Sequence, residues 1–123
     1  MRRLLTSIRD RLDRFGILVS CLCVVHCLAG LLIVAGLGLG GGVLLAPEIH
    51  RIGLALAIVV GILTIGIGVL RHGQLAPLGF ATVGLALMTA GLFVSHGPAE
   101  AAFTVCGVLL VAGAHLLNLR QTC

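Results

Sequence analysis

The chain has 123 residues, of which 59% are hydrophobic and only 10% are charged. Soluble domains carry about 25% charged residues, so this composition excludes an ordinary water-soluble globular protein. The formal charge is +4 and every cation is an arginine. No aromatic residues are interleaved with these arginines, which argues against a nucleic-acid-binding arm and favours attraction to anionic lipid. We therefore predict one integral-membrane domain over residues 1–123, with the lipid bilayer as its main partner.

The first fifteen residues form a basic, amphipathic segment. Leu5, Ile8, Leu12 and Phe15 recur at three- and four-residue spacing, and the arginines fall outside this apolar stripe. The pattern predicts a short helix that lies in the membrane interface and leads into the first span. A cleaved signal peptide is the alternative, but the apolar run that follows is longer than an h-region of roughly 7–15 residues and lacks a small-residue cleavage site.

Four apolar segments follow, each close to the roughly 20 residues that a helix needs to cross a bilayer core. We expect spans at about residues 16–39, 52–70, 75–95 and 101–119. The glycine-rich run 36–42 is expected to end the first span, and short polar loops are expected at 47–51, 71–74 and 96–100. The fold class predicted is all-α: a four-helix transmembrane bundle preceded by the interfacial helix.

Arginine placement predicts the orientation of the bundle. Seven arginines would share one side of the membrane, and the opposite side would hold only Arg51; the seven are Arg2, Arg3, Arg9, Arg11, Arg14, Arg71 and Arg120. The positive-inside rule then places both termini in the cytoplasm. In the second span, Gly53, Ala57 and Gly61 repeat every four residues, as a close helix contact requires, either within one protomer or in a homo-oligomer.

Metal-ligand side chains lie inside the first span, in a run that contains no Asp, Glu, Lys or Arg. At about 100° per residue, Cys23 and Cys27 fall roughly 40° apart with His26 beside them, whereas Cys21 points away. The same face continues to one end of the helix, so that a single stripe holds Asp13, Ser20, Cys23, His26 and Cys27. Ligand-type side chains within a membrane span are by default a functional hypothesis.

Thiolates select soft cations, and imidazole suits zinc and copper. We predict that Cys23, Cys27 and His26 bind one soft divalent ion near mid-membrane, the alternative being that they are ordinary buried side chains. His115 in the fourth span is the expected partner, provided that the first and fourth helices touch. Asn118 lies one helical turn from His115.

His50 is placed at the outer end of the second span. It is expected to join Glu48, His96 and Glu100 in an outer collar that attracts cations, with ordinary polar loops as the alternative. His72, in an Arg-His turn, is expected to be a solvated interface residue.

These motifs resemble those of the MerC family of small four-span bacterial membrane proteins, named for a mercuric-ion transporter of mercury-resistance operons. The matching pieces cover nearly the whole chain in order: Asp13-Arg14 with Gly16 ahead of Ser20; Cys23-Val24-Val25-His26-Cys27; Glu48-Ile49-His50; Arg71-His72-Gly73; and Ala114-His115-Leu116-Leu117-Asn118. The Cys-x-x-His-Cys run and the Ala-His-Leu-Leu-Asn run are the most specific of them.

The resemblance implies a bacterial inner-membrane protein, not an enzyme, that takes up a metal cation through first-span cysteines and passes it towards cytoplasmic thiols. The cation is then a substrate rather than a tightly bound cofactor: mercuric ion by resemblance, with zinc or copper as alternatives. Asp13, His115 and the lone C-terminal Cys123 are expected to assist release. Three other functions stay open, namely a metal-binding or sensing module without transport, a thiol–disulfide protein, and a purely structural membrane protein.

Overall fold

The computed structural model describes residues 1–38 and 46–121 of the chain, and within these ranges every regular element is a helix. The elements are α1 (Arg2–Leu37), α2 (Pro47–Gly61), the π-helical turn η2 (Ile62–Gly66), α3 (Ile67–His72), α4 (Ala76–Gly91) and α5 (Pro98–Arg120). Because α2, η2 and α3 follow one another without a break, they form a single rod. The all-α prediction is confirmed for the part of the chain that the structure describes.

Three of the four rods are long and apolar enough to cross a membrane: α1, the α2–η2–α3 rod and α5. The fourth, α4, is equally apolar but has only 16 residues. The span predicted at 75–95 is therefore too long at its end, because the chain leaves the helix after Gly91 and turns before α5 begins.

The separate interfacial helix predicted at the N-terminus is not present. Arg2–Leu37 is one uninterrupted helix of 36 residues. Leu5, Ile8 and Phe15 are exposed on it, while Arg9 and Asp13 are buried against the other helices. The physical reason is that Asp13 has hydrogen-bond partners on α5, which turn the polar side of this segment inward.

Two predicted loops are instead the first turns of helices. Residues 47–51 and 98–100 are helical, with Pro47 and Pro98 at the first positions. Proline suits that position because its missing N–H has no intrahelical partner there, and an acidic residue in the first turn complements the helix dipole. Glu48 and Glu100 occupy those first turns.

Glycines in the left-handed conformation end two of the helices. Gly38 closes α1 at φ 62° and Gly73 closes α3 at φ 68°, a conformation that costs glycine little. Of the turn predicted at 71–74, only Gly73 and Gln74 lie outside a helix, because α3 continues to His72. Helix α1 ends inside the predicted glycine-rich run, although the later residues of that run lie outside the described ranges.

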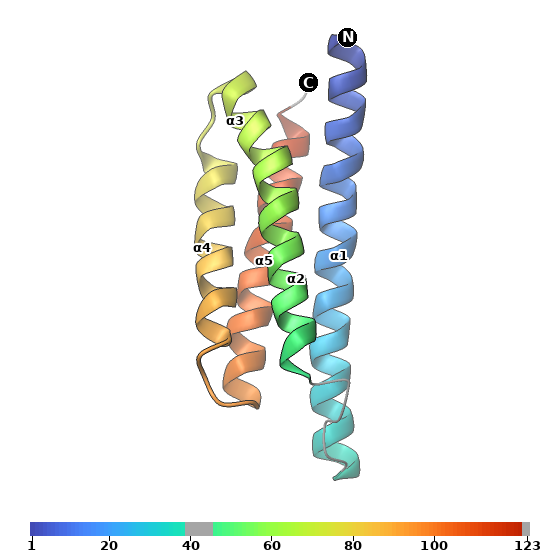
Figure 1. Ribbon diagram of the computed structural model, residues 1–123, viewed down its shortest axis with the longest axis vertical. Helices are drawn as coiled ribbons and strands as arrows, with labels where there is room; N and C mark the ends of the chain where they lie inside the picture. The colour runs from blue at the N-terminus through green and yellow to red at the C-terminus, as the bar shows by residue number, and fades with distance from the viewer. Residues whose placement is uncertain (39–45, 122–123) are drawn as a thin grey trace.

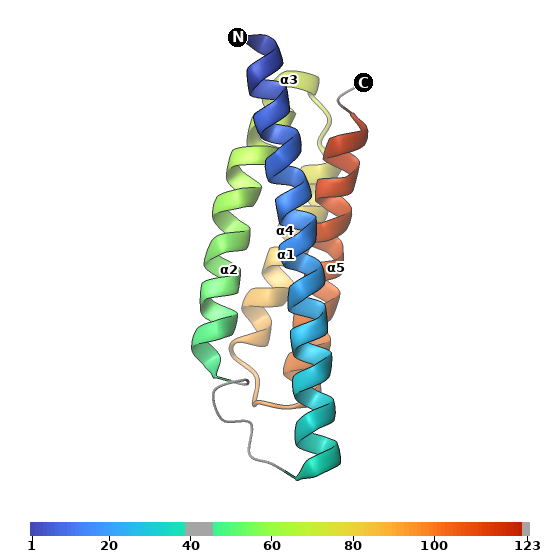
Figure 2. The same ribbon diagram turned by 90° about the vertical axis from the view of Figure 1, so that its right-hand side faces the viewer.

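Helix α5 lies at the centre of the bundle and packs against both α4 and α1 (Figures 1 and 2). The α2–η2–α3 rod runs alongside these helices and contacts all three. The α4–α5 contact is a backbone contact, since a Cβ added at Gly84 would stand 2.6 Å from the Gly107 carbonyl oxygen. Small residues permit such close approach between membrane helices. The start of α1 and the end of α5 lie at the same end of the bundle.

In the second-span stripe, Ala57 packs against the core, but the two glycines make no close helix contact with the described part of the chain. A Cβ added at Gly53 or Gly61 would meet nothing within 4 Å. A homo-oligomer contact on this face stays a prediction.

Candidate metal site and a buried polar network

Sulfur, imidazole and carboxylate groups gather in the half of the bundle away from the N-terminus. We call this set the thiol cluster, and it consists of Cys23, His26, Cys27, His50, His96 and Glu100. Cys27 Sγ lies 3.5 Å from His50 Nε2, and the Cys23 and Cys27 thiols are close enough to interact. The other nitrogen of His50, Nδ1, lies 3.7 Å from Glu100 Oε1. Helices α1, α2 and α5 each supply part of this cluster.

The thiol cluster contains polar atoms without hydrogen bonds. Nε2 of His26 and Nδ1 of His50 are both buried and have no hydrogen-bond partner in the described part of the chain. The two rings meet edge to face, with centroids 6.2 Å apart. Buried polar groups are normally paired, and an unpaired group calls for an explanation, such as a ligand or ion that it would bind.

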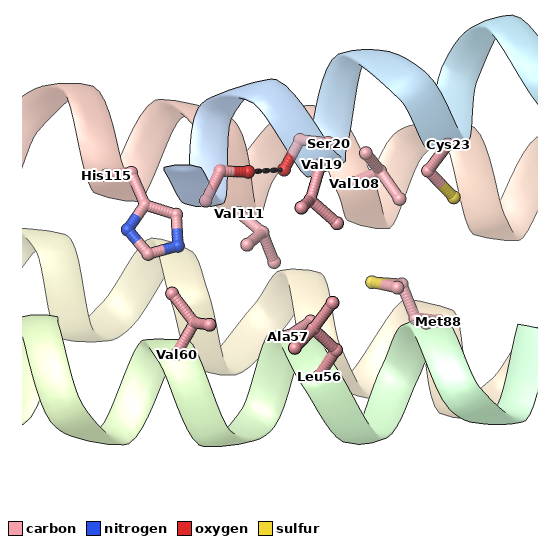
Figure 3. A pocket seen from close by; sticks show the side chains of 12 residues that line it. Val19, Ser20, Cys23, Leu56, Ala57, Val60, Met88, Val108, Val111 and His115 are labelled. Atoms are coloured by element: carbon pink, nitrogen blue, oxygen red, sulfur yellow. Dashed lines mark hydrogen bonds between the residues drawn. The ribbon is translucent and has the colours of Figure 1, made fainter. Parts of the chain in front are cut away.

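Cavities connect the thiol cluster along the bundle. One of about 270 Å³ is bordered by Cys27, His50, His96 and Glu100. A second, of about 220 Å³, is bordered by Cys23, His26 and His50. The third, of about 30 Å³, has Cys23 at one end and His115 at the other, as Figure 3 shows. Neighbouring cavities share lining residues: His50 borders the first and second, and Cys23 borders the second and third.

The opposite half of the bundle holds a second polar group, the Asp13 network, which consists of Asp13, Thr64, His72, His115 and Asn118. His115 Nδ1 lies 2.8 Å from Asp13 Oδ1, and Asn118 Nδ2 donates to Asp13 Oδ2 at 2.8 Å. The same amide group donates to the Thr64 carbonyl oxygen at 3.3 Å, and His72 Nε2 lies 3.0 Å from Asn118 Oδ1. Asp13, Thr64 and Asn118 are each 0% exposed, so the network is fully buried apart from His72.

Local backbone features bring these groups together. Gly16 lets α1 approach α5, since a Cβ there would stand 2.5 Å from His115 Nε2. Gly68 leaves room for the Asn118 amide in the same way. Thr64 lies in the π-helical turn η2, and such turns occur frequently at functional sites.

The five residues predicted to bind metal do not form one site. The structure brings Cys23, His26, Cys27 and His50 together, whereas His115 lies in the Asp13 network and shares only the smallest cavity with Cys23. In the described residues, no three His, Cys, Asp or Glu side chains are already arranged to hold an ion. Their metal-binding roles stay predictions.

Other residues take positions that the sequence did not indicate clearly. Glu100, expected in the outer collar, lies beside two of its predicted neighbours, with His96 Nδ1 2.7 Å from its Oε2 and His50 Nδ1 3.7 Å from its Oε1, but it is only 8% exposed. His72 was expected to be solvated, yet it contacts Asn118. Thr64 was not singled out, although it is the only polar side chain between residues 52 and 70, and this was the signal available.

Comparison with protein-family models gives one match, to the MerC mercury resistance protein, over residues 13–120. The chain belongs to the MerC family. The match covers both polar groups, from Asp13 at its start to Asn118 near its end, and it confirms the resemblance drawn from the sequence motifs. No curated protein and no solved structure matches the chain. Family membership and the long apolar helices identify a membrane protein related to mercury resistance.

Proposed function

We propose that this MerC-family protein carries mercuric ion, or a similarly soft cation, across the bacterial inner membrane as a four-span bundle with both termini in the cytoplasm. The observation that carries the proposal is the thiol cluster: two thiols four residues apart, one of them 3.5 Å from an imidazole nitrogen, in the apolar interior of the bundle.

The ligand chemistry of the cluster favours a soft ion. Thiolates select soft cations, and a pair of them satisfies an ion that accepts two ligands, as mercuric ion does, whereas structural zinc takes four. Cys23 and Cys27 are the primary ligands in this proposal, and His50 or His26 supplies a nitrogen. The unpaired Nε2 of His26 would gain a partner when the ion binds, whereas His50 would offer Nε2, the nitrogen 3.5 Å from Cys27 Sγ.

In this proposal, the order of the cavities along the bundle sets the direction in which the ion moves. The carboxylate of Glu100, with His96 and His50 beside it, attracts the cation at the end far from the N-terminus. The ion then loses its hydration shell between the thiols and leaves towards the cytoplasmic end. Cys123, the expected receiving thiol, lies outside the described residues.

The test compares uptake of radioactive mercuric ion into liposomes that contain purified protein. We expect the Cys23→Ser, Cys27→Ser double variant to lose uptake and stoichiometric binding. Cys21→Ser is the matched control, because Cys21 lies on the same helix but is exposed on its outer side. Uptake by the double variant at the wild-type rate would overturn the proposal.

A metal-binding module without transport is the second candidate. The Asp13 network favours it, because a buried carboxylate with a hydrogen-bond partner on each oxygen lies beyond the third cavity. Such a module would bind one ion per protein and show no flux into liposomes, whereas a carrier would show both.

A further inference from the structure

A soft donor that the sequence did not single out lies beside Cys23. Met88 of α4 borders the cavity of about 220 Å³, and it also borders the neighbouring cavity of about 30 Å³. It is one of two methionines in the chain, the other being Met1. Helix α4 has no Cys, His, Asp or Glu in its sequence, so Met88 is the side chain through which this helix can bind a soft metal ion.

Packing between α4 and α5 fixes the position of Met88. Its side chain is 7% exposed and forms a core cluster with Val108 and Val111, against which Cys23 packs. Gly107 permits this arrangement, since a Cβ there would stand 2.7 Å from Met88 Cγ. Figure 3 shows the side chains of Met88 and Cys23 extending from opposite sides into the space between the helices. Cys23 therefore has a thiol neighbour along its own helix and a thioether across the bundle.

The larger of these two cavities combines sulfur with imidazole. Cys23, Met88, His26 and His50 all border it. Its volume far exceeds the roughly 10–15 Å³ that one water molecule needs, so an ion fits between these groups. His26 Nε2 is buried and has no hydrogen-bond partner among the described residues, which leaves it available to an ion. The donors thus come from three helices, α1, α2 and α4.

The thioether changes which ions such a set prefers. Thiolate and thioether ligands select Cu(I), whereas zinc sites are built from Cys, His and carboxylate ligands. The ordinary role of a buried methionine is to fill an irregular gap in a core. Here a cavity remains on each side of Met88, so gap filling alone does not account for a methionine at this position.

The charge of the donor set favours a monovalent ion. A thioether and an imidazole are neutral ligands, and a metal-bound thiol is a thiolate. Glu100 borders the other cavity, together with Cys27, so Cys23 is the source of negative charge in this one. One thiolate balances one positive charge, and a neutral complex is the least costly to hold inside a membrane bundle.

We propose that Met88 Sδ is a ligand of the transported ion, and that the site it completes with Cys23 and His26 also takes the soft monovalent ions Cu(I) and Ag(I). The inference rests on the proposed function. On binding, the ion forms bonds to Cys23 Sγ, Met88 Sδ and His26 Nε2. The Cys23 proton leaves to solvent, the thioether has no proton to lose, and no electrons are transferred.

The experiment replaces the methionine sulfur without changing the shape of the side chain. Detergent-solubilised protein is prepared with methionine or with norleucine, which has a methylene group in place of the sulfur. All forms carry Cys21→Ser, Cys106→Ser and Cys123→Ser, so that exposed thiols do not compete. Norleucine should lower Ag(I) affinity by about 10–100-fold, measured by competition with a soluble thiol, and leave the thermal unfolding temperature unchanged.

The matched control is Met88→Leu, prepared with each of the two amino acids. Norleucine then replaces only Met1, which is 96% exposed at the N-terminus, so both preparations should show the same weakened Ag(I) affinity. Carbon-13 NMR of the methionine methyl groups gives a direct second measurement. One equivalent of Ag(I) should shift the Met88 signal, identified by its loss in Met88→Leu, and leave the Met1 signal in place.

The outcomes separate this inference from the proposed function. If the wild type binds mercuric ion but does not bind Ag(I), or binds Ag(I) equally well with norleucine, Met88 is a packing residue. The inference is then overturned, whereas the proposed function stands. If the wild type binds no mercuric ion, the proposed function falls and the inference with it.

Discussion

The two polar groups of this bundle differ in how completely their hydrogen bonds are made. In the Asp13 network, the carboxylate, the Asn118 amide and both nitrogens of His72 have partners. In the thiol cluster, His26 Nε2 and His50 Nδ1 are buried without one. Both groups lie among apolar helices, so lipid alone does not explain the difference.

The difference indicates distinct roles. A satisfied buried network stabilises one arrangement of helices, and here it joins α1, the α2–η2–α3 rod and α5. An unsatisfied buried nitrogen destabilises the ligand-free protein, and this cost is removed when a ligand supplies the missing contact. We therefore interpret the Asp13 network as the part that holds the helices together, and the thiol cluster as the part that binds the cation.

The largest expected effect is at Asp13. Asp13→Ala removes the acceptor for His115 and Asn118 and leaves Arg9 as a buried charge with less compensation. Breaking a buried charged pair in this way costs about 3–5 kcal/mol. The free energy of unfolding, measured by titrating detergent-solubilised protein with a denaturing detergent, should fall by that amount.

The control for this loss is Asp10→Ala, on the same helix and only three residues away. Asp10 is half-exposed and pairs with Arg9 at 3.5 Å, an interaction worth less than about 1 kcal/mol in such a setting. Equal losses at Asp13 and Asp10 would mean that the network does not hold the helices together, and the comparison would fail.

The same substitution made in each group gives the second prediction. His115→Leu leaves Asp13 Oδ1 without a donor and should cost about 1–3 kcal/mol of stability. His50→Leu removes the 3.5 Å contact of Nε2 with Cys27 Sγ together with Nδ1, which lacks a hydrogen bond, and should cost about 1 kcal/mol, yet lower mercuric-ion affinity by about 10–100-fold. Unfolding titrations and ion-binding isotherms on both variants measure the two effects. The opposite ranking in either measurement would contradict the division of roles.

Half of the thiol cluster could be predicted from the sequence, because Cys23, His26 and Cys27 lie on one helix, α1. Helical spacing alone placed Asp13, Ser20 and Cys27 on one face, and all three are buried, while Cys21 is exposed. The failures lay at helix starts, where the proline and acidic residues of 47–51 and 98–100 were interpreted as loops although the same residues favour first turns.

Contacts between helices were harder to predict from the sequence. Asp13 and His115 are 102 positions apart, and their pairing depends on how α1 and α5 are aligned, which small residues such as Gly16 decide. The pattern of the first fifteen residues predicted an apolar stripe facing lipid, and Leu5, Ile8 and Phe15 are exposed. It did not indicate that Arg9 and Asp13 are buried against other helices, or that this segment continues α1 instead of forming a separate helix. Nothing local indicated the π-helical turn that places Thr64 in the network.

A matched glycine pair sharpens the comparison in the Asp13 network. A Cβ at Gly68 would collide with the Asn118 amide and stand 3.0 Å from His72 Nε2, whereas at Gly66 it would meet nothing within 4 Å. Gly68→Ala should therefore destabilise the fold by about 1–3 kcal/mol. Gly66→Ala should be neutral or stabilise it by up to about 1 kcal/mol, since alanine favours helix. Thermal unfolding of both variants decides this, and a loss at Gly66 as large as that at Gly68 would show that backbone effects, not the network, are being measured.

The smallest expected effect is at the carboxylate of the thiol cluster. Glu100 lies 3.7 Å from His50 and borders the largest of the three cavities, but it is separated from Cys23 by His50, so it should act on capture rather than on final affinity. Charges at the edge of a site chiefly change association rates and their salt dependence. Glu100→Gln should lower the initial rate of ion binding by about 2–10-fold at low salt, with a smaller deficit at high salt.

Glu48→Gln is the matched control, because Glu48 occupies the equivalent first turn of α2 but is exposed. Stopped-flow binding at two salt concentrations distinguishes the variants: an equal deficit for both would indicate a diffuse field of the whole face, whereas a deficit confined to Glu100 would place capture at the cavity that leads to Cys27.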